Sequence, residues 1–231
     1  MAGSIAPNTV TDGLVLALDA ANKKSYLGSG TAWTDLSSNG NNGTLVNSPL
    51  YNGESNGNLA FDGVNTYVSV PAITPSRITL SCWFKPTGVS TNDDSYGGIL
   101  IVSNSQYYLG GVQFAMNYSW AYQRSGVTIK NVQCVAPVNS ILHNSLTNVV
   151  GVYDGTTIKI YINGVLRNTT NHSIDPVYPT TGDTTVKIGK WGYAQYTRQF
   201  NGNIYQALIY DKPLSSQEIL QNYNATKLRF I

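Results

Sequence analysis

The chain has 231 residues and a mass of 25.0 kDa, and 42% of its residues are hydrophobic, which suffices for one large domain with a sizeable core. Only 11% are charged, and 14 Lys and Arg against 12 Asp and Glu leave a net charge of +2. These values exclude a wholly disordered chain and give no electrostatic signature for nucleic acid or an anionic membrane. No apolar run approaches the roughly 20 residues of a membrane helix, and residues 1–11 lack the segments of a secretory signal.

Short apolar or alternating segments separated by turn residues predict strands along most of the chain. The first is a buried strand within residues 13–20. Residues 38–58 are predicted to be loop, because Asn and Gly are dense there, apart from the apolar pair Leu45–Val46. Further strands are predicted at 67–70, 77–85, 99–102, 112–116, 186–188 and 204–210.

The clearest local pattern lies between residues 148 and 168. An apolar segment meets Asp154–Gly155, an alternating segment follows, and Asn163–Gly164 leads into a third segment. Asp-Gly and Asn-Gly adopt the positive φ angles of tight hairpin turns at little steric cost. This pattern predicts a three-stranded antiparallel meander.

One helix is predicted near the C-terminal end, where Ser215 and Glu218 have the spacing of a capping box. Its apolar stripe consists of Leu214, Ile219, Leu220 and Tyr223. Many short strands without alternating helices predict an all-β fold, a two-sheet antiparallel jelly-roll sandwich with one short C-terminal helix. We expect an N-terminal arm at 1–12, a single domain at 13–226 and a tail at 227–231.

Two cysteines, Cys82 and Cys134, are too few for a disulfide framework or a thiolate zinc site. Cys82 shares a strand face with Leu80 and Phe84, which favours a buried free thiol over a bridge to Cys134.

Five motifs stand in order along the chain: GLVLALDA at 13–20, WTDLSSNGNNGTL at 33–45, FDGVNTYV at 61–68, YING at 161–164, and FNGNI with IYDKPLS at 200–215. Together they resemble the concanavalin A-like lectin/glucanase superfamily in its laminin-G-like jelly-roll branch. The resemblance implies the same sandwich fold.

Residues 22–30 and 221–230 are closer to one subset, the jelly rolls in structural proteins of tailed bacteriophages, those of aquatic phages in particular. This resemblance implies a non-enzymatic structural protein at the virion surface, as capsid decoration, head fibre or tail appendage. Its partners would be other virion proteins and copies of itself in a homo-oligomer, and we expect one or both of the terminal segments, residues 1–11 and 228–231, to dock on such a partner. The alternative is a carbohydrate-binding adhesin that recognises host-surface glycans.

Glycosidases of the superfamily carry paired carboxylates as E-x-D-x-x-E on one strand face. This chain has two Glu, Glu54 and Glu218, without that motif, and the adjacent Asp93 and Asp94 would point to opposite sides of an extended chain. His143 and His172 belong to no catalytic spacing, so we expect exposed or locally bonded loop histidines. We therefore expect no catalytic residues and no enzymatic activity.

Many relatives hold calcium between an Asp-containing loop and an acidic pair in the last strand. Asp35, Asn39 and Asn41 occupy that loop here, but Tyr205–Gln206 stands where the acidic pair would be. Since calcium prefers several oxygens including carboxylates, we expect no metal and no cofactor. A calcium ion is the alternative to a loop held by Asx-type hydrogen bonds.

The candidate ligand-binding residues are Trp191, Tyr193 and Tyr196, in a predicted loop beside Arg198, and Trp120 and Tyr122 form a second aromatic pair. Flat aromatic faces can stack on sugar rings while amide groups bond to hydroxyls. The competing interpretation is that these tyrosines cover sheet edges or meet a neighbouring subunit, and we favour it over a sugar site.

Overall fold

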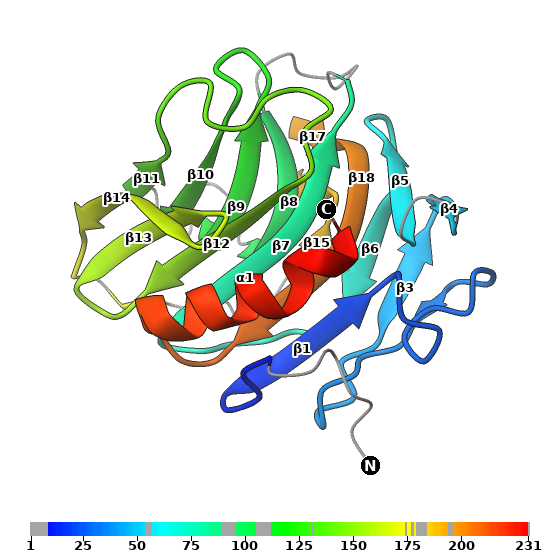
Figure 1. The fold of residues 1–231 in the computed structure, drawn as a ribbon, viewed down its shortest axis with the longest axis horizontal. Coiled ribbons are helices and arrows are strands. Elements are labelled where there is room, and N and C mark those ends of the chain that lie inside the picture. The colour runs from blue at the N-terminus through cyan, green and yellow to red at the C-terminus, as the bar shows by residue number, and fades with distance from the viewer. Residues whose placement is uncertain are drawn as a thin grey trace.

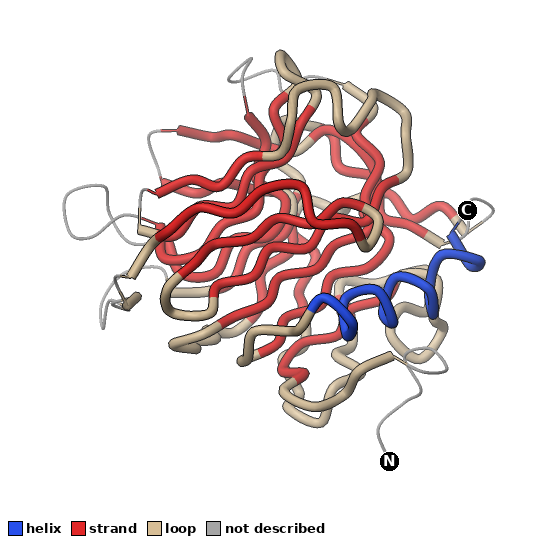
Figure 2. The backbone as a smooth tube through the Cα atoms, turned by 60° about the vertical axis from the view of Figure 1, so that its left-hand side comes forward, coloured by secondary structure: helices blue, strands red, loops and turns tan. Residues whose placement is uncertain are grey.

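A computed structural model of the chain describes residues 9–53, 57–88, 96–104, 112–130, 132–173, 175–176, 178, 184–193 and 196–230. Within these residues, two antiparallel sheets pack face to face, and a helix crosses the outer face of one of them (Figures 1 and 2). The predicted two-sheet antiparallel sandwich with a C-terminal helix is confirmed.

The sheet under the helix, sheet A, has the order β14-β13-β12-β7-β18-β5-β4, and β1 also pairs with β18. Its strands are β1 (Leu14–Asp19), β4 (Leu50–Asn52), β5 (Asn58–Asp62), β7 (Ile78–Pro86), β12 (Thr147–Tyr153), β13 (Thr157–Ile162), β14 (Val165–Asn171) and β18 (Asn201–Tyr210).

The facing sheet, sheet B, has the order β11-β10-β9-β8-β15-β6-β3-β2. Its strands are β2 (Ala32–Trp33), β3 (Gly43–Val46), β6 (Tyr67–Val70), β8 (Tyr96–Asn104), β9 (Val112–Ser119), β10 (Arg124–Ile129), β11 (Val132–Val135) and β15 (Val186–Ile188). A separate hairpin of β16 (Lys190–Tyr193) and β17 (Tyr196–Gln199) packs against β8.

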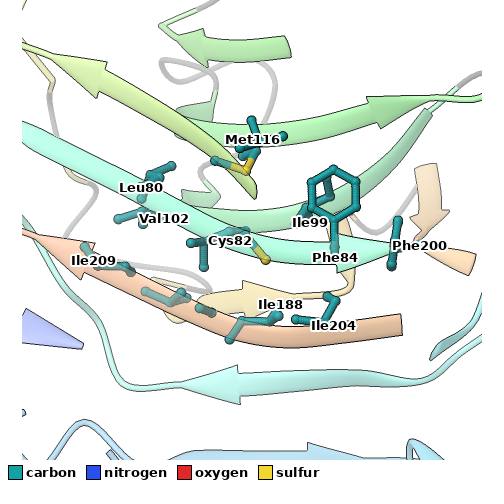
Figure 3. Packing of buried hydrophobic residues seen from close by; sticks show 14 of the residues in the cluster. Leu80, Cys82, Phe84, Ile99, Val102, Met116, Ile188, Phe200, Ile204 and Ile209 are labelled. Carbon is teal, nitrogen blue, oxygen red and sulfur yellow. The ribbon is translucent and has the colours of Figure 1, made fainter. Parts of the chain in front are cut away.

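The core lies between the two sheets, where the inward faces of the strands alternate with outward ones (Figure 3). In β7, Leu80, Cys82 and Phe84 point into this core, as the alternation predicts.

Both cysteines are free and buried, so the buried-thiol prediction is confirmed. Burial raises the pKa of the Cys82 thiol, which therefore stays protonated.

The predicted meander is formed by β12, β13 and β14. Asn163 and Gly164 adopt φ angles of 52° and 78°, which the two-residue turn requires. At the other turn, the Asp154 carboxylate accepts hydrogen bonds from the backbone N–H groups of Thr156 (2.9 Å) and Thr157 (2.8 Å) and from Lys159 Nζ (2.8 Å). The turn chemistry read from the sequence thus fixes both hairpins.

The helix α1 (Ser216–Phe230) begins at the predicted capping box. The backbone N–H of Ser215 donates to Glu218 Oε2 (2.7 Å), and that of Glu218 donates to Ser215 Oγ (3.2 Å). Four residues make up its buried face: Ile219, Asn222, Thr226 and Phe230. The amphipathic stripe is therefore longer and more polar than predicted.

The expected C-terminal tail differs in the structure, because residues 227–230 form the last turn of α1. Trp83 points outward from sheet A, and Phe230 covers it with ring centroids 5.2 Å apart. Phe230 also lies 5.7 Å from the ring of Tyr205 and is 3% exposed. Phe230 is therefore buried on its own sheet, and docking of one or both termini on a partner stays a prediction.

The end of the N-terminal arm also packs on its own chain. The backbone N–H of Val10 donates to Asn222 Oδ1 (2.8 Å), and Tyr210 Oη donates to the carbonyl of Val10 (3.0 Å). Residues 1–8 lie outside the described part, so docking of the arm's first residues on a partner stays a prediction.

We predict that Phe230→Ala lowers the free energy of unfolding by about 3 kcal/mol, because it removes a buried ring and uncovers Trp83. Urea unfolding followed by tryptophan fluorescence measures this change. The matched control is Leu228→Ala, at an 87% exposed position in the same turn, which should cost less than about 0.5 kcal/mol. Equal small effects of the two changes would show that the last turn does not stabilise the sandwich.

Candidate functional site

The predicted aromatic site falls on the β16–β17 hairpin rather than in a loop. The hairpin register pairs Tyr193 with Tyr196 and Trp191 with Arg198. The side chains of Tyr193 and Tyr196 lie outside the described part of the structure, so ligand binding by this trio stays a prediction.

Trp191 is partly buried and packs on Ile101 and Ala115, which project from the outer face of sheet B. The hairpin backbone lies so close to Gly98 that a Cβ there would be 2.3 Å from the backbone nitrogen of Trp191. Glycine at this position therefore lets the hairpin sit on the sheet, and Trp191 helps to fasten it. This contact is of the kind that the packing interpretation expects.

Cations and tyrosine rings alternate beside this hairpin. Lys187 Nζ and Lys190 Nζ lie 5.3 Å and 4.6 Å from the ring centroid of Tyr67. The guanidinium of Arg198 lies 5.6 Å from the ring centroid of Tyr96. These distances are within the range of cation–π interactions.

The second expected aromatic pair does not form. Trp120 is 3% exposed and belongs to the core, with its ring 5.6 Å from that of Tyr118. Tyr122 is exposed and lies 4.7 Å from the guanidinium of Arg124. The two rings therefore present no shared surface.

The Asp35 loop is organised by hydrogen bonds. Asp35 Oδ1 accepts from the backbone N–H groups of Ala17 (2.8 Å) and Ser37 (2.9 Å), and Oδ2 accepts from Ser37 Oγ (2.6 Å) and the backbone of Asn41 (2.9 Å). The amide of Asn39 donates to the carbonyl of Leu14 (3.1 Å). Both oxygens of the Asp35 carboxylate thus accept hydrogen bonds, as expected for a loop held by Asx-type hydrogen bonds.

The two histidines differ in environment. His143 is exposed, as expected, but His172 is 7% exposed and lies 5.7 Å from the ring of Tyr153, which corrects the prediction of an exposed or locally bonded side chain. Burial first, and then the charge of Lys130, lower the pKa of His172. Its Nε2 has no hydrogen-bond partner, so this histidine is a neutral packing residue under the β13–β14 edge.

The acidic residues weighed for catalysis are scattered. Glu218 caps α1 and pairs with Lys212 at 3.0 Å, while Glu54, Asp93 and Asp94 lie outside the described residues. Among the described residues, no three His, Cys, Asp or Glu side chains come together in the way a metal site requires.

Two adjoining clefts, of about 350 and 470 Å³, were not anticipated from the sequence. They lie at the side of the sandwich where β4 is the last strand of sheet A and β2 the last strand of sheet B, and they share Gly30 and Thr31. The first is lined by Tyr26, Gly28, Gly30, Thr31, Leu45, Ser48, Pro49, Leu50 and Tyr51, and the second by Lys23, Lys24, Ser25, Leu27, Ser29, Gly30, Thr31, Ala32 and Thr34.

The opposite side of the sandwich is closed. There the side-chain amide of Asn168 in β14 donates to the carbonyl of Val135 in β11 (2.9 Å), which joins the edges of the two sheets. The two clefts therefore lie on the open side of the sandwich. The sequence feature that could have indicated the clefts is a tyrosine close to glycines in each of the segments 26–30 and 51–53. This pattern is more typical of turns than of a binding site.

We predict that the thermal stability of the wild-type chain is the same in millimolar calcium and in chelator, because hydrogen bonds already engage both oxygens of Asp35. Asp35→Asn should lower the free energy of unfolding by about 2 kcal/mol, since the new NH₂ group would face N–H donors. The control Ser38→Ala changes an exposed side chain of the same loop and should have little effect. A calcium-dependent rise in Tm that Asp35→Asn abolishes would instead establish a calcium site.

Solved structures show the same fold in larger proteins. A Trypanosoma rangeli sialidase in complex with the inhibitor DANA has a TM-score of 0.69 at 15% identity, covering 100% of this chain and 37% of the sialidase. A mutant of HCR/D has a TM-score of 0.68 at 16% identity, over 96% of this chain and 53% of that one. The botulinum neurotoxin serotype D binding domain has a TM-score of 0.66 at 16% identity, over 93% and 52%.

These neighbours contradict the expectation that the chain is not an enzyme, because enzymes are among the structures most similar to it. The chain spans about a third of those sialidases, at 15% identity or less, so the likeness shows a lectin-like fold and assigns no activity to this chain. Within the described residues, no helix has the length and apolarity needed to cross a membrane.

No curated protein matches the chain. The family described as the concanavalin A-like lectin/glucanases superfamily matches residues 61–220, which is more than half of the sequence. The fold, the motif order and this match agree, and the chain belongs to the concanavalin A-like lectin/glucanases superfamily.

Proposed function

We propose that the chain is a structural domain at the surface of a tailed-phage virion, where it packs against other virion proteins or against copies of itself. The proposal is supported by the resemblance of residues 22–30 and 221–230 to jelly rolls of tailed phages and by the low share of charged residues, 11%. A surface of neutral polar and aromatic side chains suits a subunit that is packed against neighbours.

The observation that carries the proposal is an exposed apolar patch, here called the helix–hairpin patch, formed by Leu166 and Leu220. Leu166 pairs with Tyr161, whose hydroxyl lies 3.0 Å from Ser216 Oγ, so Leu166 is on the helix side of sheet A. The two side chains are 47% and 46% exposed. The hairpin turn lies against the helix, since a Cβ at Gly164 would be 3.1 Å from Leu220 Cδ1. Apolar side chains gathered on a surface mark sites of protein association.

The strand beside the patch adds to this argument. In the described residues β14 is the last strand of sheet A on this side, and nearly all its side chains are exposed. Such an edge offers backbone N–H and C=O groups for pairing with another chain. The helix–hairpin patch and the β14 edge together form a surface suited to a protein neighbour.

We predict that the double substitution Leu166→Asp and Leu220→Asp reduces incorporation into virions at least tenfold, because it places two charges in the patch. Quantitative mass spectrometry of purified particles from complemented phage measures incorporation, and light scattering measures self-association. The matched control is Leu142→Asp, which is 54% exposed but lies in the loop between β11 and β12. Wild-type incorporation of the double variant, or absence of the wild-type protein from particles, would overturn the proposal.

A second candidate function is recognition of host-surface carbohydrate by the same surface domain. The adjoining clefts favour it, because they combine two tyrosine rings with hydroxyl groups and lysines on the open side of the sandwich. Concave sites lined by aromatic groups and a few polar groups are the usual form of small-ligand sites.

A further inference from the structure

We infer that the two adjoining clefts form one binding site for an acidic saccharide, a sugar whose ring carries a carboxylate. The inference rests on the second candidate function, carbohydrate recognition, and gives it a location and a ligand class. In this arrangement the ring lies in the first cleft and its carboxylate reaches the second.

The wall between the clefts is built before any ligand arrives. Tyr26 Oη donates to the carbonyl of Gly30 (3.0 Å), and Ser25 Oγ donates to the carbonyl of Thr34 (2.6 Å). The backbone N–H of Thr34 in turn donates to the carbonyl of Ser25 (2.8 Å). These hydrogen bonds order residues 22–34 in the free protein. Ligand binding therefore loses little conformational entropy in this loop.

The first cleft offers an aromatic floor. The rings of Tyr26 and Tyr51 meet edge to face at 5.2 Å and 62°. Tyr26 is buried, whereas Tyr51 is partly exposed and borders the cleft. Two glycines leave room for its ring, since a Cβ at Gly28 or Gly53 would lie 3.0 or 3.1 Å from Tyr51 Cε1. A sugar ring has the apolar C–H surface that packs on such a ring, and Ser48 and Thr31 on the rim supply hydroxyls.

The second cleft supplies the charge. Lys23 and Lys24 line it, and the residues that line the two clefts include no Asp or Glu. Lys23 Nζ lies 5.5 Å from the ring centroid of Tyr51, which places a cation directly beside the aromatic floor. Within the described part of the chain, neither lysine makes an ion pair. A neutral sugar would leave both charges uncompensated, and inorganic phosphate would make no use of the tyrosines, so the combination points to a carboxylated sugar.

The test uses the full chain and isothermal titration with trimers of galacturonic, glucuronic and mannuronic acid. The methyl ester of each trimer is the matched ligand, because it keeps the sugar and removes the charge. At least one acid trimer should bind ten times more tightly than its ester, and that preference should shrink as salt is added.

Two sets of variants locate the site. Lys23→Gln with Lys24→Gln should remove the preference for the acid form, and Tyr51→Ala should weaken both forms at least tenfold. The lysines are exposed, so the first variant folds even where the second does not. The control Lys227→Gln removes an equivalent cation–π lysine on α1, 5.6 Å from the ring of Tyr223, and should change nothing.

The outcomes separate the inference from the proposed functions. Binding that survives the cleft variants but is lost with Trp191→Ala would keep carbohydrate recognition and overturn the cleft as its site. Equal binding of acids and esters would overturn the acidic ligand, and binding of no trimer would overturn the inference as a whole. Incorporation into virions, tested through the helix–hairpin patch, is independent of these results.

Discussion

The pairing of β18, the last strand of the chain, holds sheet A together. Its residues Asn201–Ile204 pair with β5 and Gln206–Tyr210 pair with β1 on one edge, while β7 pairs along the other edge. A bulge between Ile204 and Gln206 separates the two halves, so that one edge can serve two partners. Sheet A is therefore complete only when the two ends of the chain have met, and the sandwich is rich in contacts between distant segments.

A buried carboxylate couples this strand to the helix. Asp19, at the end of β1, is fully buried and accepts hydrogen bonds from Gln206 Nε2 (3.0 Å), the backbone N–H of Ala21 (3.0 Å) and the guanidinium of Arg229. Burial raises the pKa of Asp19, and the Arg229 charge opposes that rise. A buried charge without partners is energetically costly. The last turn of α1 therefore stabilises the fold, because it carries Arg229 to the Asp19 carboxylate. Gln206, which the family resemblance places at the position of an acidic pair, here donates to a carboxylate instead of supplying one.

The same positioning explains why the helix buries polar side chains. Trp83 Nε1 donates to Thr226 Oγ1 (3.0 Å), and the amide of Asn222 donates to Tyr210 Oη (3.0 Å). Each bond fits one rotation and one register of the helix, so the polar stripe specifies how α1 lies on the sheet. Leu220 is consequently left outward next to the β13–β14 turn, where it joins the helix–hairpin patch.

The sequence predicted the features that depend on neighbouring residues. Alternation located most strands of the core, and Asn163–Gly164 and the Ser215–Glu218 box located a turn and a helix start. The extent of α1 was missed because Asn222 and Thr226 interrupt its apolar pattern, although they face the sheet. The strands β4, β10 and β11 were missed as well. The Asn- and Gly-rich segment 38–58, which contains β4, was predicted to be loop, and Gly126 and Gln133 weaken the alternation of β10 and β11.

The clefts could not be predicted for a different reason. Their walls come from residues 23–34 and 45–51, which the pairing of β2 with β3 and of β4 with β5 brings together. A tyrosine among glycines suggests a turn in any sequence, and only the open side of the sandwich makes it part of a concave surface. Concavity is a property of how segments meet, which no local pattern encodes.

The topology also separates the two surfaces proposed here. In sheet A, β14 is the last strand on one side and β4 on the other, and Figure 1 shows them at opposite ends of the sandwich. A domain fixed to a particle through the β14 edge and the helix–hairpin patch would therefore turn its clefts away from that contact. Because five strands of sheet A lie between β14 and β4, substitutions at one site should leave the other intact. The rigid sandwich would then act as a spacer that holds a sugar-binding surface outward from the shell that carries it.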